Sequence, residues 1–347
     1  MPSTPTPTAG LRETDIRPDD LMAGQAERFA ADVRRLLAHK ARFVLVRCPA
    51  CDADAPTKAF DKCDLDYQIC GKCDTMYVSP RPPLDVLAEF YATSENYAYW
   101  NKYIFPASEA ARREKLFRPR AERLADMCRR FGITGGTLLE VGAGFGTFCE
   151  EVRTLGLFDR VIAVEPTPGL AETCRNRGLE VIEQPIEEVD LGGTKADVVA
   201  AFEVIEHLFS PADFLTGCRD RLPDSGLLLL SCPNGRGFDV LTLGKLSNTV
   251  DVEHLNYFHP DSLAGLAKRC GFEVLDILTP GELDAELVRR RVLAGEVDLS
   301  AQPFLKRVLV DEWDRLGPPF QRFLADNQLS SHMWLIARKA QPVGADQ

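Results

Sequence analysis

The chain reads Thr-Leu-Leu-Glu-Val-Gly-Ala-Gly-Phe-Gly at residues 137–146, and a helix-like segment follows directly at residues 147–152. This is the order of a short apolar strand, a glycine turn and a helix. Glycine lets the backbone approach a ligand closely, and the first turn of a helix presents unpaired N–H groups. Plain tight turns and several kinds of nucleotide-binding protein share such a loop. Neighbouring residues must therefore decide between a turn and a ligand site.

The next apolar run favours a ligand site. Residues 161–165 read Val-Ile-Ala-Val-Glu, so Glu165 lies nineteen residues after Gly146. A Rossmann-like sheet places a carboxylate at this point, where it accepts hydrogen bonds from both ribose hydroxyls. Glu140, on the first strand, would oppose a pyrophosphate at the helix N-terminus. It suits a ligand that carries an amino group and a sulfonium instead.

Short apolar runs alternate with helix-sized segments from residue 137 onward. This alternation predicts an α/β fold with a Rossmann-like, mainly parallel sheet of seven strands, covered by helices on both faces. Residues of about 281–330 are expected to form a helical insertion before the last strand. The clearest strand candidates are residues 137–141, 160–164, 197–201, 226–231, 272–277 and 332–337.

Three spaced motifs resemble motifs I, II and IV of class I S-adenosylmethionine (SAM) dependent methyltransferases, most closely the subgroup related to ubiquinone-biosynthesis enzymes. The motifs are Leu139-Glu-Val-Gly-Ala-Gly-Phe-Gly146, Val164-Glu-Pro166 and Phe202-Glu-Val-Ile-Glu-His207. The resemblance implies that SAM is the cofactor. By it, the glycines border the methionine part, Glu165 holds the ribose, residues 184–187 flank the adenine, and the fourth strand covers the cofactor. The implied cofactor-binding residues are Glu140, Gly142, Gly144, Gly146, Glu165, Gln184, Phe202 and Glu203.

Four of the eleven cysteines form two Cys-x-x-Cys pairs, and the other seven are scattered singly. The pairs are Cys48 with Cys51 and Cys70 with Cys73, with eighteen residues between Cys51 and Cys70. This spacing is typical of a structural zinc ribbon, because each pair places two thiolates on one edge of a tetrahedron. Two local disulfides or coincidental core cysteines are the alternatives. The ribbon resembles the N-terminal module of bacterial sugar methyltransferases, including C-methyltransferases that act on nucleotide-linked keto-sugars.

Two Glu-His pairs are the candidates for acid–base chemistry: Glu206-His207 after the fourth strand and Glu253-His254 after the fifth. Parallel sheets bind ligands at the carboxyl ends of their strands. A histidine near its ordinary pKa can take a proton from a hydroxyl or from a carbon next to a carbonyl. The alternatives are a scaffold role for Glu206-His207 and a backbone-bonded loop histidine at 254. The keto-sugar family, which the chain resembles, favours a base, but Asp251 stands where those enzymes usually have tyrosine.

The remaining segments complete the expected domain organisation. Residues 1–20 are expected to be a disordered tail, 21–46 a helix, 47–83 the zinc-ribbon module and 84–131 an aromatic-rich helical cap. Residues 132–347 would then form the SAM-binding domain. In the cap, Tyr97, Tyr99, Trp100 and Tyr103 either stack on the acceptor or pack the cap onto the core.

Composition limits the partners. The net charge of −11 argues against a broad grip on nucleic acid or an anionic membrane, since both need a positive surface. No apolar run approaches the length of a membrane span, and the first ten residues lack the apolar core of a secretory signal. We therefore expect a cytoplasmic protein, a monomer or a homodimer, whose partner is a small-molecule acceptor.

These observations favour a methyltransferase of a sugar or another small polar biosynthetic intermediate, with histidine as the general base. The first alternative is a non-sugar acceptor, such as a polyketide or a quinone-like molecule. The second is an inactive methyltransferase fold that serves as a binding module. The sequence leaves open whether carbon, oxygen or nitrogen is methylated, and carbon and oxygen are the two that the residues favour.

Overall fold

The computed structural model describes residues 12–340, and residues 1–11 and 341–347 lie outside it. The part of the expected disordered tail at residues 1–11 is therefore not described. Over residues 13–20 the expectation was wrong, because α1 (Glu13–Ile16) and the beginning of α2 (Asp19–Ala38) are helical. Asp19 and Asp20 occupy the first turn of α2, where carboxylates interact favourably with the helix dipole. The helix expected over residues 21–46 ends at Ala38, and a 3₁₀ turn, η1 (Lys40–Arg42), follows.

The main sheet has the seven strands that the sequence predicted, and their order is β10-β11-β8-β7-β4-β5-β6. Strands β8, β7, β4, β5 and β6 are parallel, and β11 pairs antiparallel with both β8 and β10. The six predicted strands are present with shifts of one or two residues at their ends, and the seventh is the short β6. The bounds are β4 (Thr137–Val141), β5 (Arg160–Val164), β6 (Glu180–Ile182), β7 (Val198–Phe202), β8 (Leu227–Pro233), β10 (Phe272–Leu278) and β11 (His332–Lys339).

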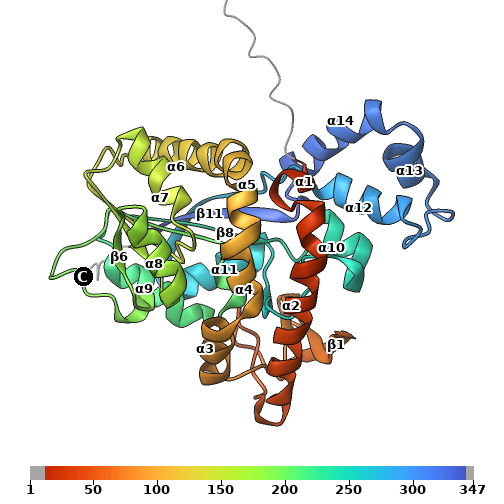
Figure 1. The fold of residues 1–347 in the computed structure, drawn as a ribbon, viewed down its shortest axis with the longest axis horizontal. Helices are drawn as coiled ribbons and strands as arrows, with labels where there is room; N and C mark the ends of the chain where they lie inside the picture. The colour runs from red at the N-terminus through yellow and green to blue at the C-terminus, as the bar shows by residue number, and fades with distance from the viewer. Residues whose placement is uncertain (1–11, 341–347) are drawn as a thin grey trace, which may run out of the picture.

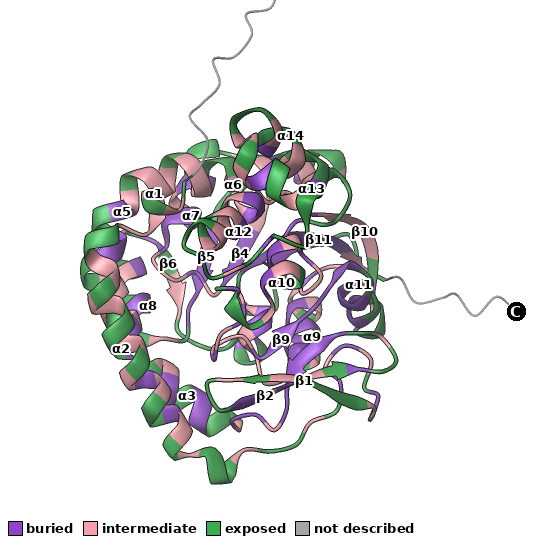
Figure 2. Ribbon diagram, turned by 90° about the vertical axis from the view of Figure 1, so that its right-hand side faces the viewer, coloured by how far each residue is buried: buried purple, intermediate pink, exposed green. Residues whose placement is uncertain are grey.

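Both faces of this sheet are covered, which is why its strands are continuously apolar. Successive residues of a strand point to opposite faces, so Leu138 and Leu139 belong to two different cores. One face packs against α6 (Arg118–Arg130) and α7 (Thr147–Leu155). The other packs against α9 (Pro211–Arg221) and α11 (Pro260–Arg269). Figure 2 shows the resulting buried layer between the exposed outer surfaces of the helices.

A second sheet holds the cysteine module and has the order β1-β2-β3-β9. Three of its strands come from the N-terminal part of the chain: β1 (Pro56–Lys62), β2 (Leu65–Cys70) and β3 (Met76–Val78). The fourth, β9 (Asn256–Tyr257), belongs to the segment that begins just after His254. The expected module at residues 47–83 is therefore completed by a strand from the expected SAM-binding domain, and the two share one packed core.

Helices form the rest of the structure. A helical path runs through α3 (Leu84–Thr93), α4 (Glu95–Tyr99), the π-helix η2 (Trp100–Ile104), α5 (Phe105–Arg112), the π-helix η3 (Arg113–Phe117) and α6. In Figure 1, α4 and α5 run beside the long α2. The expected insertion between β10 and β11 is helical and comprises α12 (Asp284–Leu293), α13 (Pro303–Lys306), the π-helix η7 (Arg307–Asp311) and α14 (Trp313–Asp326). Within residues 12–340, no helix combines the length and apolarity that a bilayer span requires.

Candidate active site

The glycine loop joins β4 to α7 and touches the loop that follows β7. Gly142 has φ of 75°, and a Cβ there would lie 2.5 Å from Cγ2 of Val204. Gly144 also has a left-handed φ, 55°, but a Cβ there would meet no described atom within 4 Å. Gly142 is therefore required for packing, whereas Gly144 borders open space that a ligand can occupy.

Two buried glutamates flank the glycine loop. Glu165 accepts hydrogen bonds from the N–H groups of Gly144 and Thr167, both at 2.9 Å. Burial raises the pKa of Glu165, and these two donors partly offset the rise. Each carboxylate oxygen has further acceptor capacity, so Glu165 can still bind ribose hydroxyls. Because one of its donors is the Gly144 amide, Glu165 also fixes the shape of the loop.

Glu140 is the second flanking glutamate, and it is 4% exposed at the end of β4. The Cys149 thiol on α7 donates to its Oε2 at 2.9 Å. Burial raises the pKa of Glu140 to about 8, so the carboxyl is mostly protonated at neutral pH. An ammonium group beside it would stabilise the ionised form. The carboxyl is therefore suited to a cationic ligand.

The end of β7 holds Phe202 and Glu203. The Phe202 ring lies 4.7 Å from the Phe148 ring and 5.1 Å from the Trp334 ring, between centroids, and the Arg120 guanidinium covers it at 4.6 Å. Glu203 has a left-handed φ of 57°, which is uncommon outside glycine and is concentrated at functional sites.

His332 contacts Glu203, although no pattern in the sequence indicated it as a site residue. Ser231 donates to Oε1 of Glu203 at 2.6 Å, and Nδ1 of His332 lies 3.4 Å from the same oxygen. The Trp334 indole N–H donates to Nε2 of His332 at 3.1 Å, so the ring proton belongs on Nδ1, which faces Glu203. His332 begins the antiparallel strand β11, and only the pairing of β11 with β8 brings it to the carboxyl ends of the parallel strands.

Gln184 follows β6 at the outer edge of the sheet and is exposed. Ile182, at the end of β6, accepts a hydrogen bond from the Glu165 amide at 3.0 Å. The segment expected to flank the adenine therefore starts next to the expected ribose ligand. The role of Gln184 stays a prediction.

The two Glu-His pairs, far apart in sequence, meet in one cluster. His207 ends η5 (Ile205–His207), and its ring centroid lies 4.7 Å from that of His254. Nδ1 of His207 lies 3.0 Å from the Glu253 carbonyl oxygen, and Nδ1 of His254 lies 2.7 Å from the Thr249 carbonyl oxygen. A carbonyl only accepts, so both rings carry their proton on Nδ1. Nε2 of each ring is left as a proton acceptor.

The carboxyl groups of the two pairs have different surroundings. Glu206 is 1% exposed, and neither of its carboxylate oxygens has a hydrogen-bond partner among the described residues. Burial raises its pKa well above the ordinary value, and one oxygen lies 3.8 Å from Nε2 of His207. Burial and the nearby Asp251 raise the pKa of Glu253 to about 7, although Tyr97 donates to it at 3.0 Å.

The two histidines also differ. Burial, aided by the neighbouring His254, lowers the pKa of His207 to about 3, so that ring stays neutral. His254 instead has a carboxylate beside it, because Oδ1 of Asp251 lies 3.9 Å from its Nδ1 and accepts from its backbone N–H at 2.9 Å. Asp251, the departure noted in the sequence, therefore holds the backbone at His254 and places a carboxylate near its ring.

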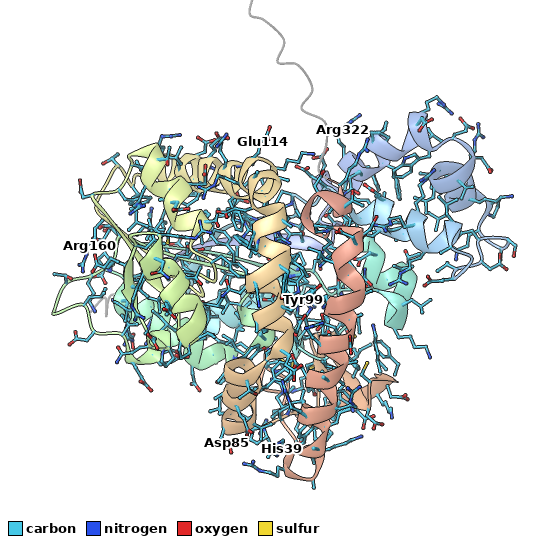
Figure 3. The ribbon with its side chains drawn as sticks, viewed as in Figure 1. His39, Asp85, Tyr99, Glu114, Arg160 and Arg322 are labelled. Atoms are coloured by element: carbon cyan, nitrogen blue, oxygen red, sulfur yellow. The ribbon has the colours of Figure 1, made fainter. Side chains whose placement is uncertain are left out.

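The aromatic stretch of the cap divides into two groups. Tyr91 and Tyr97 face the cluster, with the Tyr91 ring 6.3 Å from that of His207. The rings of Tyr99 and Tyr103 contact each other at a tilt of 43°, with 4.9 Å between centroids, and Arg28 of α2 covers the Tyr99 ring at 4.4 Å. Figure 3 shows Tyr99 between α4 and α2. For Tyr99 and Tyr103 the packing alternative is therefore the one observed.

The four paired cysteines converge on one point. Their Sγ atoms all lie within 4.8 Å of one another, with 3.5 Å between Cys48 and Cys73 and 3.6 Å between Cys51 and Cys70. Four thiolates at about 2.3 Å from a tetrahedral zinc ion would be separated by roughly 3.8 Å. No disulfide links them. The donor set and its spacing therefore fit zinc, and Cys63 is exposed and outside the cluster.

Comparison with known proteins agrees with this geometry. A family model described as a methyltransferase domain matches residues 110–277. The match covers just under half of the chain, and the sheet order and the glycine loop of these residues are consistent with it. It supports SAM as the cofactor.

Several curated relatives are methyltransferases. The C-methyltransferase NovU of Streptomyces niveus is 26% identical over 255 residues, which cover 72% of this chain and 56% of NovU. A probable S-adenosylmethionine-dependent methyltransferase, MT3114, of Mycobacterium tuberculosis (strain CDC 1551 / Oshkosh) is 31% identical over 153 residues, 44% of this chain and 52% of the relative. The ubiquinone biosynthesis O-methyltransferase of Cereibacter sphaeroides (strain ATCC 17025 / ATH 2.4.3) is 26% identical over 202 residues, which cover 53% of this chain and 80% of the relative. The chain thus spans about half the length of the first two relatives.

Proposed function

We propose that the protein transfers a methyl group from SAM to a small polar biosynthetic intermediate, with a nucleotide-linked sugar as the first candidate. The observation that carries the proposal is the cluster of Glu206, His207 and His254, whose acid–base atoms lie within 4.8 Å of one another. The cluster follows the strand β7, next to β4 and its glycine loop, and Gly142 packs against Val204 of the same loop. A methyl donor and a proton acceptor would therefore share one site.

In this proposal His254 is the general base. Its Nε2 takes a proton from an acceptor hydroxyl or from a carbon next to a carbonyl, and Oδ1 of Asp251 lies 3.9 Å from its Nδ1. The electron pair left on the acceptor forms the new bond to the methyl carbon as the bond from that carbon to the sulfonium breaks. The products are the methylated acceptor, S-adenosylhomocysteine and one proton. Neutral His207 and Glu206 would orient the acceptor, and alignment supplies much of the remaining rate.

We further propose that Cys48, Cys51, Cys70 and Cys73 hold a structural zinc ion. A shell of four thiolates is closed and leaves no position for a substrate, so the zinc would stabilise the module without taking part in methyl transfer. Two contacts fix the module to α11: Nε2–H of His259 donates to the Cys73 carbonyl oxygen at 2.7 Å, and Arg269 donates to the Ala50 carbonyl oxygen.

The acceptor class is tested by supplying methyl-labelled SAM with two acceptor panels, nucleotide-linked keto-sugars and quinone-like phenols. We expect label on a sugar, and mass spectrometry and NMR would locate it on carbon or oxygen. The NovU match, which covers more of this chain than the domain model does, makes carbon the first position to examine. Label on the phenols alone would overturn the sugar proposal. Absence of both label and S-adenosylhomocysteine binding would overturn methyl transfer itself.

A further inference from the structure

Arg81 is fully buried, yet it makes no ion pair within the described residues. Its side chain is 0% exposed and donates four hydrogen bonds, all to neutral oxygens. The acceptors are the Val78 carbonyl (3.0 Å), the Phe209 carbonyl (3.2 Å), the Asn256 side-chain amide (3.0 Å) and the Leu255 carbonyl (3.3 Å). Burying a guanidinium without a counter-charge costs free energy. Its four hydrogen bonds offset part of this cost, and they also join separate segments of the chain.

Asn256 continues this network on the other side. It is 1% exposed, and its Oδ1 accepts from Arg81. Its Nδ2 group lies within hydrogen-bonding distance of the carbonyl oxygens of Ile205 (3.2 Å), Glu206 (3.2 Å) and Leu208 (2.8 Å). These three residues surround His207. The Leu255 amide adds a backbone bond to the Glu206 carbonyl at 2.8 Å.

The two residues therefore connect three parts of the fold. Arg81 follows β3 of the cysteine module, Phe209 follows η5, and Leu255 and Asn256 directly follow His254. Backbone pairing of Tyr77 with Asn256 ties the module to the same segment.

We infer that Arg81 and Asn256 are positioning residues that set the geometry of His207 and His254. The network fixes the backbone on both sides of His207 and directly after His254. It thereby keeps the Glu253 carbonyl opposite Nδ1 of His207 and holds both rings in one tautomer. The cysteine module thus contributes to the active site through this network. The importance of the two histidines rests on the proposed function.

The test uses the zinc-loaded, full-length protein with selectively ¹⁵N-labelled histidine. The chain has only five histidines, so their imidazole signals can be assigned by substitution. A fixed tautomer gives two widely separated nitrogen shifts, and interconverting tautomers bring these shifts together. Arg81→Lys loses the planar guanidinium group and most of its N–H donors. In this variant we expect the separation between the two nitrogen shifts to disappear for His207 and His254 but not for His332.

Asn256→Asp is the second variant, because it keeps the shape of the side chain and the contact with Arg81. It replaces the Nδ2 donor with an oxygen that repels the three carbonyl oxygens. We therefore expect the nitrogen shifts of His207 and His254 to come together in this variant too, although it creates no cavity. Arg338→Lys is the matched control: Arg338 donates to the Phe131 carbonyl at the opposite edge of the sheet, and all five histidines should be unchanged.

S-adenosylhomocysteine binding separates positioning from general damage. Its dissociation constant, measured by calorimetry, should stay within about twofold of the wild-type value in both variants, because none of the side-chain hydrogen bonds of Arg81 and Asn256 reaches the glycine loop. With any acceptor found active, kcat should fall at least about tenfold while KM for SAM changes little. Unchanged tautomer signals of His207 and His254 in both variants would overturn the inference. Absence of methyl transfer by the wild-type protein would count against the proposed function alone, since the tautomer and binding measurements need no acceptor.

Discussion

The imidazole rings of His207 and His254 lie 4.7 Å apart, centroid to centroid, at an interplanar angle of 70°. They come from different loops, and each donates its Nδ1 proton to a backbone carbonyl. The arrangement leaves two proton-accepting nitrogens near a buried carboxyl group, which is the chemistry that a transfer to a weakly acidic hydroxyl or carbon needs.

Replacement of His254 should separate catalysis from cofactor binding. For His254→Asn we expect methyl transfer to fall by about 10²- to 10⁴-fold, the usual contribution of a general base. The S-adenosylhomocysteine affinity should not change, because His254 lies outside the glycine loop. Turnover of labelled SAM and calorimetry measure the two quantities. His39→Asn, on the turn after α2, is the control, and full activity of His254→Asn would exclude the base role.

Replacement of Glu165 should weaken cofactor binding. Glu165→Ala removes the acceptors for the ribose hydroxyls and also frees the Gly144 amide, so we expect about 1.5–3 kcal/mol less binding energy, roughly a 10- to 100-fold rise in Kd. Glu180→Ala serves as the control, because Glu180 forms only an exposed ion pair with Arg160 on neighbouring strands. Equal affinities of the two variants in calorimetry would contradict the assignment.

The raised pKa of Glu140 predicts that cofactor binding depends on pH. Below about pH 8 the carboxyl of the free protein is protonated, and an ammonium group beside it favours the carboxylate. Binding should therefore release a proton at pH 7, and the affinity should rise up to about pH 8 and then level off. Calorimetry in buffers of different ionisation enthalpy counts the proton. Glu140→Gln should abolish its release.

The same shift has an opposite effect on the stability of the cofactor-free protein. Between the ordinary pKa of 4.5 and about 8, Glu140 is protonated in the folded state and ionised in the unfolded state, so its contribution to the free energy of unfolding falls as the pH rises. Glu140→Gln removes this loss. We expect it to raise the Tm of the cofactor-free protein at pH 7.5, and a lower Tm would show that the carboxylate is stabilised when folded.

Zinc removal should act first on the cysteine module. Cys70→Ser breaks the four-thiolate set, and we expect loss of bound zinc and faster proteolysis within residues 56–70. The reason is that zinc binding contributes roughly 10–16 kcal/mol to the folding of small zinc modules. Cys63→Ser is the matched control, because Cys63 is exposed between the same strands and should leave one zinc per chain. Elemental analysis that finds no zinc in either protein would refute the zinc site.

Much of the candidate site could be predicted from sequence because its signals are local. Strand β4, the glycine loop and Glu165 lie on short continuous stretches, whose apolar runs and glycines already dictate backbone direction. The paired cysteines are local in the same sense. These stretches predicted the sheet, the cofactor class and the candidate zinc ligands.

The remaining features depend on contacts between distant segments, which no local pattern encodes. The pairing of β9 with β3 joins the cysteine module to the histidine loops, and the pairing of β11 with β8 brings His332 to Glu203. The direction of each cap tyrosine depends on which surface the helix meets, so Tyr97 reaches Glu253 while Tyr99 packs on α2. The sequence by itself determined the candidate cofactor site, since its strand, turn and helix are contiguous. Only the tertiary structure decided which groups gather around His207 and His254, since they come from distant segments that meet only when the core is packed.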